Sequence, residues 1–454
     1  MNCLKRKQLE AVRQCLHGRR LLLSELPFDR EWIDYCLKNH YISSEPALLQ
    51  SPSGWRCRRC GATASHLFSS HFCHICQRDC TYCRHCLKIG KVASCHSLFT
   101  WIKNEFFYPA KENACVWSGQ LSVLQQQAAA VLKHAVETEF CTALVWAVCG
   151  AGKTELLYPA LDECFRSGKR VALAAPRTDV IKELEPRLKE AFPSIETSVL
   201  YGGRRKQAIQ AQLVLATTHQ LMRYYQTFDV LVVDEVDAFP YSYDASLQYA
   251  VHQAKKPNAT TILLSATPSS SLLRKKDLLI AKIPKRFHNH PLPVPRTEWI
   301  GNWRSALKRK QIPSIITKWL TKYDQCPKMI FLPSIETLQT FSELLAERKI
   351  DHAAVYAEAA NRHADIAAFR KKKHNLLLTT TILERGVTVE NVQVAVLGSE
   401  DRIFTVACLT QISGRVGRKA HFPSGDIVFW HYGRTKAMLQ AIQHIKQMNK
   451  EAFA

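Results

Sequence analysis

The sequence predicts an α/β protein with two lobes, each built on a parallel β-sheet, and a small N-terminal zinc-binding domain. Three observations lead to this fold class. Short apolar runs alternate with helix-like stretches in two regions, a proline-rich segment divides these regions, and cysteines crowd together ahead of the first one. A chain of 454 residues also exceeds what one hydrophobic core usually covers. We expect domains at 1–112, 113–290 and 291–454.

Composition favours a globular protein with a polyanionic partner. Hydrophobic residues make up 46% of the chain and charged residues 22%, which excludes a largely disordered protein. The 62 Lys and Arg residues exceed the 39 Asp and Glu residues, giving a net charge of +23 that suits nucleic acid or an anionic membrane surface without distinguishing them. The apolar stretches at 21–23 and 141–149 are too short for a signal peptide or a membrane span, so we expect a cytoplasmic protein.

The N-terminal region carries a zinc-finger pattern at about 55–92. Seven of the 17 cysteines lie between Cys57 and Cys86, and this crowding in a long chain favours a metal site over disulfides. Cys57-x-x-Cys60 and Cys83-x-x-Cys86 are knuckles of the kind that place four thiolates around one Zn²⁺, a closed and therefore structural site. The ligand set stays open because other cysteines lie between the knuckles: Cys73, Cys76 and Cys80.

Apolar runs mark the strands of the two sheets. Buried runs with helical stretches between them are typical of βαβ units, in which the strands are parallel. The segment 288–303, with three prolines, is expected to be an irregular interlobe linker. The predicted strands of the first lobe are 143–149, 171–174, 213–216, 230–233 and 262–264, and those of the second are 329–332, 376–378, 394–397 and 427–430.

The first of these runs leads into a phosphate-binding loop. Gly150-Ala151-Gly152-Lys153-Thr154 lies between the apolar run and a helical stretch, which is the order that such a loop needs. The glycines let backbone N–H groups face the phosphates of ATP, Lys153 neutralises β/γ-phosphate charge, and Thr154 coordinates Mg²⁺. Ala147 stands where the strict pattern has its first glycine.

An acidic motif completes this site. The strand at 230–233 ends in Asp234-Glu235-Val236-Asp237. At the carboxyl end of a buried strand, Asp234 is suited to hold Mg²⁺ and Glu235 to orient and deprotonate the attacking water. Such a tetrapeptide alone is equally compatible with a solvated loop, but with the phosphate-binding loop it predicts an ATPase.

Two further motifs follow in a characteristic order. Ser265-Ala266-Thr267-Pro268 comes after the acidic motif, and Gln411-Ile412-Ser413-Gly414-Arg415-Val416-Gly417-Arg418 lies in the second region. Together the motifs resemble superfamily 2 helicases and translocases over roughly 115–435. This resemblance implies two RecA-like lobes that share one ATP site, to which the second lobe contributes Gln411, Arg415 and Arg418. An arginine supplied across a cleft acts only when the lobes close, which ties hydrolysis to motion.

Weaker matches to the same superfamily imply further contacts. Gln125 resembles the glutamine that reads adenine. The segment 380–388 resembles one that touches both nucleic acid and nucleotide, which implies these roles for Thr380 and Gly386, although Thr388 replaces a common Asp and no ribose contact is carried over. Three positions resemble those that grip the phosphodiester backbone, a sequence-independent contact: Arg177, Thr217 and His219.

The cysteine knuckles resemble a more specific family. Cys57-Arg58-Arg59-Cys60 and Tyr82-Cys83-Arg84-His85-Cys86, ahead of the helicase motifs, are similar to the paired cysteines of the late-competence ComFA family of Gram-positive bacteria. This resemblance assigns the zinc to Cys57, Cys60, Cys83 and Cys86. It makes Cys73 and Cys76 supernumerary or part of a variable insertion. The alternative is a switched ligand set, in which one of the intervening cysteines replaces an assigned zinc ligand.

The ComFA resemblance also implies a function. It implies an ATP-driven motor that pulls single-stranded transforming DNA into the cytoplasm, located peripherally at the inner face of the membrane beside a DNA channel. It further implies a ComFC-like partner with a phosphoribosyltransferase fold, and an oligomer is compatible with it. The expected cofactors are ATP, Mg²⁺ and Zn²⁺.

Three alternatives are weaker. A PriA-like replication-restart helicase has zinc-binding cysteines that interrupt the second lobe, whereas here they all precede the phosphate-binding loop. An RNA helicase usually has different forms of the acidic and arginine motifs. A DNA-binding scaffold with a vestigial ATPase does not require the retention of Lys153, Asp234, Glu235 and both arginines.

Overall fold

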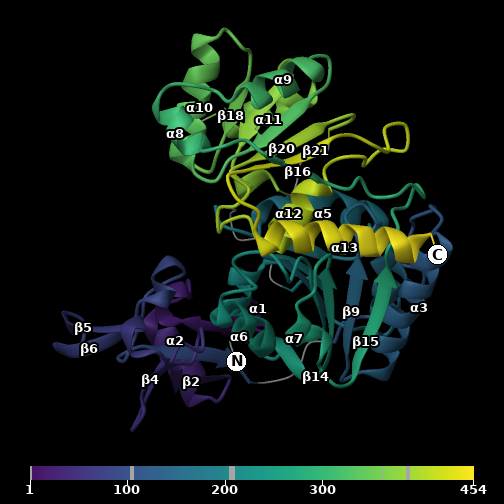
Figure 1. Cartoon of the computed structure of the whole chain (residues 1–454). Coiled ribbons are helices and arrows are strands. Elements are labelled where there is room, and N and C mark those ends of the chain that lie inside the picture. Colours follow the sequence, from purple (N-terminus) through teal and green to yellow (C-terminus); the bar gives the residue numbers. More distant parts are fainter. Residues whose placement is uncertain (1–2, 103–106, 204–209, 360, 385–388, 454) are drawn as a thin grey trace.

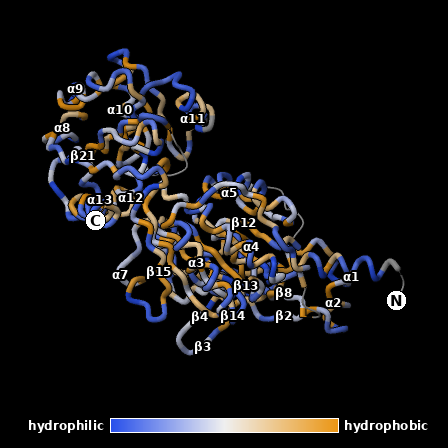
Figure 2. Tube along the Cα trace, turned by 90° about the vertical axis from the view of Figure 1, so that its right-hand side faces the viewer, coloured by the Kyte–Doolittle hydropathy of each residue, from blue (hydrophilic) through white to orange (hydrophobic). Residues whose placement is uncertain are grey.

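The computed structural model describes residues 3–102, 107–203, 210–359, 361–384 and 389–453. Figure 1 shows an N-terminal region beside a central first lobe, and a second lobe above it. Each lobe has an all-parallel sheet, which confirms the predicted fold class. Hydrophobic segments are concentrated around the sheet of the first lobe, near β13 in Figure 2.

The N-terminal region contains three small antiparallel β-structures. A sheet of order β1-β8-β2 packs its apolar side against α1 and α2, β3 and β4 form a hairpin, and β5-β6-β7 form a second sheet. The elements are α1 (Cys3–Leu16), β1 (Arg20–Leu22), α2 (Arg30–Lys38), β2 (Ile42–Pro46), β3 (Leu48–Ser51), β4 (Gly54–Cys57), β5 (Phe68–Cys73), β6 (Arg78–Cys83), β7 (Val92–Ala93) and β8 (Ser97–Trp101).

The first lobe is a seven-stranded sheet of order β11-β12-β10-β13-β14-β9-β15. All five predicted strands are present, and two edge strands were missed: β11, where two polar residues precede Val-Leu, and β15, whose apolar run is interrupted by Lys282. The strands are β9 (Thr142–Ala147), β10 (Val171–Ala175), β11 (Thr197–Leu200), β12 (Leu213–Thr217), β13 (Phe228–Val233), β14 (Lys255–Ser265) and β15 (Leu278–Ile283). The helices are α3 (Val123–Thr138), α4 (Tyr158–Arg166), α5 (Thr178–Ala191), α6 (Ala245–Ala254) and α7 (Ser270–Leu273).

The second lobe is a six-stranded sheet of order β16-β21-β20-β17-β19-β18. The four predicted strands correspond to β17, β19, β20 and β21. The strands are β16 (Arg296–Trp299), β17 (Lys328–Phe331), β18 (Ala353–Val355), β19 (Leu376–Thr379), β20 (Gln393–Leu397) and β21 (Ile427–His431). The helices are α8 (Trp303–Lys308), α9 (Ser314–Lys322), α10 (Ile335–Glu347), α11 (Arg362–Arg370), α12 (Val406–Ser413) and α13 (Lys436–Ala452).

The expectation of an irregular linker at 288–303 is partly wrong, because β16 lies inside it. Its residues pair in register with β21, and the guanidinium of Arg296 donates to both carboxylate oxygens of Asp426 at 3.1 Å. The prolines precede this strand, so they do not interrupt its hydrogen bonds. The segment is therefore an edge strand of the second lobe preceded by a proline-rich connection.

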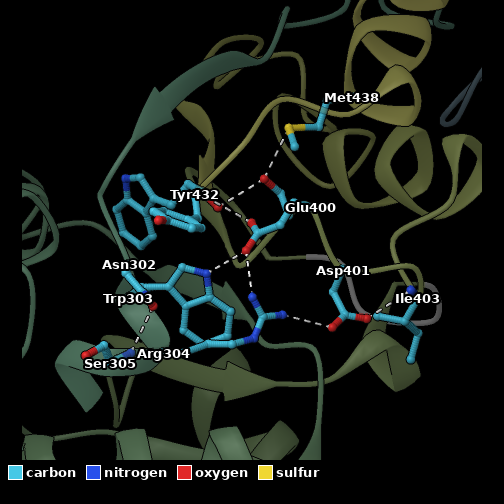
Figure 3. Close-up of polar contacts among 11 residues, drawn as sticks. Asn302, Trp303, Arg304, Ser305, Glu400, Asp401, Ile403, Tyr432 and Met438 are labelled. Atoms are coloured by element: carbon cyan, nitrogen blue, oxygen red, sulfur yellow. Dashed lines mark hydrogen bonds and ion pairs between the residues drawn. The ribbon is translucent and has the colours of Figure 1, made fainter. Parts of the chain in front are cut away.

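A polar network holds the start of α8 against the end of β20 (Figure 3). The indole of Trp303 donates to Glu400 at 2.8 Å, and Arg304 donates to Glu400 at 2.9 Å and to Asp401 at 3.1 Å. The backbone N–H of Tyr432 also donates to Glu400, at 3.3 Å. Because Trp303 is buried, these contacts anchor the end of the interlobe segment rather than forming an open site.

Helix α13 connects the two lobes at the C-terminal end of the described chain. Its buried Met438 and Ala441 belong to the core of the second lobe, whereas Ile445 and Met448 belong to the core of the first. Figure 1 shows the helix lying across the upper edge of the first lobe. The lobes are therefore joined by packing as well as by the chain between β15 and β16.

Candidate ATP site and nucleic-acid interface

The phosphate-binding loop follows β9 at the carboxyl edge of the first sheet. Gly150 and Gly152 adopt φ values of +83° and +74°, a region that glycine enters without strain. At Gly152 a Cβ atom would lie 2.3 Å from the amide nitrogen of Gln125, so any other residue there would displace that side chain from the loop. Beyond Thr154 the chain makes one 3₁₀ turn before α4 begins, a tighter start than the continuous helix expected. The loop thus has the glycine-dependent shape that the sequence indicated.

Gln125 supports this loop from α3. Its carbonyl oxygen accepts the N–H of Ser122 at 2.8 Å, in a capping box at the helix start, and its amide nitrogen donates to the carbonyl of Ala151 at 2.9 Å. Both polar atoms of the side chain therefore contact the protein. In this structure the residue holds the phosphate-binding loop, and the adenine contact implied for it stays a prediction.

The acidic motif lies at the end of β13, beside the loop. Asp234 accepts the N–H of Glu235 at 2.8 Å, and Glu235 has a φ of +56°, an uncommon conformation for a residue with a side chain. Asp237 accepts the hydroxyl of Thr267 at 2.6 Å, which joins the acidic motif to the Ser-Ala-Thr segment. The acidic motif and the Ser-Ala-Thr segment are therefore bonded directly, through Asp237.

A pocket of about 520 Å³ brings most of the predicted ATP-site residues together. This volume lies within the range of small-molecule sites. The first lobe contributes Gln125, Gly150, Ala151, Gly152, Lys153, Thr154, Asp234 and Glu235, and the second contributes Gln411 and Arg418. Trp117 and Leu121 also line the pocket and offer an apolar surface suited to a base. Gly386 lies outside the described residues.

The two predicted arginines lie differently. Arg418 lines the pocket, and its Nε donates to the carbonyl of Gly414 at 2.9 Å. Arg415 does not line it: its side chain is 1% exposed and its Nε donates to the carbonyl of Glu384 at 3.0 Å. Burial, reinforced by Arg418, lowers the pKa of Arg415 well below its ordinary value, and the nearby Glu235 opposes this shift. In this arrangement Arg418 is the arginine that faces the phosphate loop.

Sequence reasoning missed Arg286, which joins the phosphate-binding loop to the arginine motif. Its buried guanidinium donates to the carbonyl of Cys149 at 3.2 Å on the first lobe. On the second lobe it donates to the carbonyls of Val416 at 2.7 Å, of Gly417, and of Gly414 at 3.4 Å. The thiol of Cys149 also donates to Gln411 across the interface, at 2.8 Å. No motif marks Arg286, because its partners are backbone carbonyls from distant segments.

Arg177, one of the residues predicted to grip nucleic acid, lies between the lobes and has protein partners there. Its guanidinium pairs with Glu384 at 2.6 Å and donates to the carbonyl of Thr381 at 3.3 Å. A second interlobe pair joins Arg362 and Asp179 at 2.6 Å. Arg177 therefore lies where a phosphodiester would compete with Glu384.

The other nucleic-acid candidates differ in exposure. Thr217 ends β12 and is only 6% exposed, so little of its side chain reaches solvent. Thr380 is half-buried just before the 3₁₀ turn Thr381–Leu383. Burial lowers the pKa of half-buried His219, partly offset by the Asp244 carboxylate. Their contacts with nucleic acid therefore stay predictions.

The predicted zinc ligands converge. The buried sulfur atoms of Cys57, Cys60, Cys83 and Cys86 all lie within 4.8 Å of one another. Two of their separations are 3.7 Å, between Cys57 and Cys86, and 3.6 Å, between Cys60 and Cys83. Zn–S bonds of about 2.3 Å in a tetrahedron place the sulfurs about 3.8 Å apart. The four thiols therefore fit a structural Zn²⁺.

This cysteine module packs on the first lobe. Gly61, at φ +74°, lies so close to the ring of Tyr249 that a Cβ atom would be 2.5 Å from it. Glu25 joins the module to the lobe by pairing with Arg59 and Arg223, each at 2.8 Å. His85, inside the second knuckle, contacts Asp244 at 3.1 Å. The module therefore lies beside the part of the lobe that carries His219.

Comparisons with known proteins agree with this organisation. Three family models match in succession: the competence protein ComFA N-terminal domain over residues 5–100, the DEAD/DEAH box helicase over 123–274, and the helicase conserved C-terminal domain over 308–420. The competence protein ComFA of Bacillus subtilis is 43% identical over 446 residues, covering 97% of this chain and 96% of that protein. ComFA of Streptococcus pneumoniae is 36% identical over 416 residues, covering 90% and 93%.

Solved structures match the two lobes. Saccharomyces cerevisiae Dbp5 bound to RNA and ADP BeF3 has a TM-score of 0.55 at 16% identity, covering 72% of this chain and 88% of that one. The Mycobacterium smegmatis helicase Lhr bound to ssDNA and AMP-PNP also has a TM-score of 0.55, at 18% identity, covering 73% and 50%. These matches show the fold alone. Among the described helices, none is both long and apolar enough to cross a membrane.

Proposed function

The chain belongs to the ComFA family, and on this premise we propose that it is an ATP-driven translocase that draws single-stranded transforming DNA into the cytoplasm. Its helicase domains make it a competence-associated, ATP-dependent helicase-like enzyme of superfamily 2 that binds nucleic acid. The observation that carries the finer proposal is the pocket shared by the two lobes, which is lined by Lys153 and Glu235 of the first lobe and by Arg418 of the second. Turnover at such a site depends on how the lobes close.

Each residue of the proposed ATP site has a distinct chemical role. Thr154 and Asp234 would hold Mg²⁺, which supplies charge neutralisation and orients the phosphates. Lys153 binds the β- and γ-phosphates, and Glu235 accepts a proton from the attacking water. Arg418 stabilises the charge that develops on the transferred phosphoryl group. The site thus divides its chemistry between the lobes.

The proposed link to DNA runs along the same interface. Arg177 and Glu384 form an ion pair between the lobes, and the backbone carbonyl of Glu384 accepts from Arg415. A phosphodiester at Arg177 would therefore meet the residue that holds Arg415 of the arginine motif. The net charge of +23 favours such a strand irrespective of its sequence.

Membrane proximity and partners are also part of the proposal. We place the protein peripherally at the inner face of the cell membrane, indirectly associated with a DNA channel and with a ComFC-like protein. The support is the family alone. Co-purification with a ComFC-like protein tests that association, and separate elution of the two proteins would contradict it.

ATP turnover with and without single-stranded DNA tests the motor. We expect turnover to rise with DNA in the wild type and to be abolished by Lys153→Ala, because phosphate charge is no longer neutralised. Lys189→Ala is the matched control, since Lys189 is a lysine of α5 that pairs with Glu185 at 2.8 Å, away from the pocket. Turnover indifferent to DNA would contradict a DNA-driven motor.

Transformation of cells tests the uptake role. Cells with Lys153→Ala should still bind DNA at their surface but should not bring it into the cytoplasm, whereas Lys189→Ala cells should transform normally. Normal transformation of the Lys153→Ala cells would show that this ATPase does not power DNA uptake.

A further inference from the structure

The cysteines between the two knuckles form a separate group at the tip of the β5–β6 hairpin. Cys73 ends β5, Cys76 lies in the turn and Cys80 lies in β6. In the antiparallel register Cys73 is opposite Arg78 and His71 is opposite Cys80, so Cys73 and Cys80 are diagonal neighbours on the same face of the hairpin. The hairpin register therefore brings Cys73 and Cys80 together, and the turn places the sulfur of Cys76 beside that of Cys80.

A fourth thiol comes from beyond β7. Tyr82 pairs with Ala93 between β6 and β7, and the N–H of Ser94 donates to the carbonyl of Thr81 at 2.8 Å. Continuing this antiparallel pairing by one residue places Cys95 beside Cys80. Sequence analysis missed Cys95, because a single cysteine after the second knuckle has no spacing signal of its own.

The geometry of this group matches that of a metal site. All four sulfur atoms lie within 4.8 Å of one another. The separation is 3.2 Å between Cys76 and Cys80 and 3.9 Å between Cys73 and Cys95. These values bracket the roughly 3.8 Å edge of a tetrahedral zinc–thiolate site and exceed the roughly 2.05 Å of a disulfide bond.

Strand alternation separates this group from the first cluster. Cys80 and Cys83 lie on the same strand, three residues apart, so their side chains point to opposite faces of the sheet. One ion cannot bind both thiols. The sulfur atoms also converge in two separate groups of four, so Cys73, Cys76 and Cys80 belong to a second set instead of replacing a ligand of the first.

The hairpin also lacks an apolar core that would explain its buried thiols. Cys73 and Cys80 are buried, yet in the described parts of the chain no hydrophobic cluster includes any of the four thiols. The neighbouring Phe72 and Ile75 are exposed by 51% and 87%, so they do not form a core either. Small β-structures without a core are usually held by disulfides or a metal.

We propose that Cys73, Cys76, Cys80 and Cys95 bind a second structural Zn²⁺, independent of the ion at Cys57, Cys60, Cys83 and Cys86. Four closed thiolate ligands leave no open position for catalysis. The ligands of the two ions alternate along the chain. The first ion therefore links β4 to β6, whereas the second links β5, β6 and the segment after β7. This inference does not rest on the translocase function, because it concerns metal content alone.

Elemental analysis of the purified full-length chain gives the direct test. We expect two zinc ions per chain in the wild type. A wild-type content of one zinc would overturn the proposal, as would iron with acid-labile sulfide in place of zinc. Alkylation without a reductant, followed by mass spectrometry, should find no disulfide among these cysteines, and a disulfide there would also overturn it.

Variants locate the second ion. The double variant Cys73→Ser/Cys76→Ser should retain one zinc, and Cys57→Ser/Cys60→Ser should lose the other ion. Cys326→Ser is the control, since Cys326 is a half-buried cysteine of the second lobe outside both groups, and it should retain two. Two zinc ions in the Cys73→Ser/Cys76→Ser chain would refute the assignment. If that variant does not fold, the zinc content of the wild type and its Co²⁺ titration still test the second site.

Metal titration adds a second readout. The chelated wild-type chain should take up two equivalents of Co²⁺, with the absorption bands expected of tetrahedral thiolate coordination at both sites. Saturation at one equivalent would contradict the second site. ATP turnover is measured in parallel, so that loss of the motor and loss of the metal are distinguished.

Discussion

Replacing Arg286 by methionine should slow ATP turnover without unfolding either lobe. The guanidinium bonds to the carbonyls of Val416, at 2.7 Å, and of Gly417, both on the second lobe. Burial, with Arg418 acting in the same direction, lowers the pKa of Arg286 to about 10, so the group stays charged at neutral pH. The bonds that hold the lobes together here are therefore charge-assisted ones.

The loss of these hydrogen bonds can be converted into an expected change in the rate of ATP turnover. A hydrogen bond to a charged group contributes about 1.5–3 kcal/mol, so two interlobe bonds contribute at least about 3 kcal/mol to the closed arrangement. If closure is needed for hydrolysis, this loss slows turnover by about 10²-fold. Lysine keeps the charge but not the planar fork, so Arg286→Lys should fall between the wild type and Arg286→Met.

The assay is steady-state ATP turnover with saturating single-stranded DNA, alongside thermal unfolding of each variant. The control is Lys285→Ala, because Lys285 is the adjacent cation and lies 4.6 Å from the ring of Phe453, outside the pocket. Wild-type turnover in Arg286→Met, with an intact fold, would refute the argument that this residue couples the lobes.

Three other predictions follow from single contacts. Arg177→Ala should weaken single-stranded DNA binding equally for all sequences and reduce the salt slope by about 0.7, measured by fluorescence anisotropy; a change confined to one sequence would contradict a phosphate contact. Gly152→Ala should weaken nucleotide binding at least about tenfold, since its Cβ would lie 2.3 Å from Gln125 at a positive φ; unchanged affinity for a fluorescent nucleotide would count against this. Burial, with Arg170, lowers the pKa of His17 from its ordinary 6.5 to about 3, so the unfolded chain binds an extra proton between these values and stability falls as the pH drops below 6.5. His17→Gln should remove about 2 kcal/mol of this loss at pH 5 in denaturant unfolding, and the exposed-site variant His252→Gln should not; equal acid sensitivity in all three chains would contradict it.

Local sequence signals were sufficient to predict much of the fold and of the phosphate loop. The predicted strands are buried runs flanked by turns, and a parallel sheet covered on both faces requires that pattern. The loop at Gly150 and Gly152 was predictable because the required backbone conformation selects the residue type. Both signals lie within a few consecutive residues.

The parts that were missed depend on distant partners. Arg286 bonds to carbonyls that follow it by more than 100 residues, and backbone carbonyls leave no trace in a motif. The strand β16 was hidden by the prolines before it, because its stability comes from pairing with β21. Cys95 has no spacing signal until the hairpin register brings it to the other thiols. Tertiary contacts decide each of these cases.

The difference between the two arginines of the second lobe follows from the same interface. Glu384 uses its side chain to pair with Arg177 of the first lobe and its backbone carbonyl to hold Arg415. The segment that retains Arg415 is therefore bound, in this arrangement, by the residue expected to meet DNA phosphate. Arg418 is held by the carbonyl of Gly414, within the motif itself, and already faces the pocket. Arg415 is thus linked through Glu384 to the predicted DNA contact at Arg177, whereas Arg418 is held within its own motif. This difference explains why identical side chains three residues apart have such different surroundings.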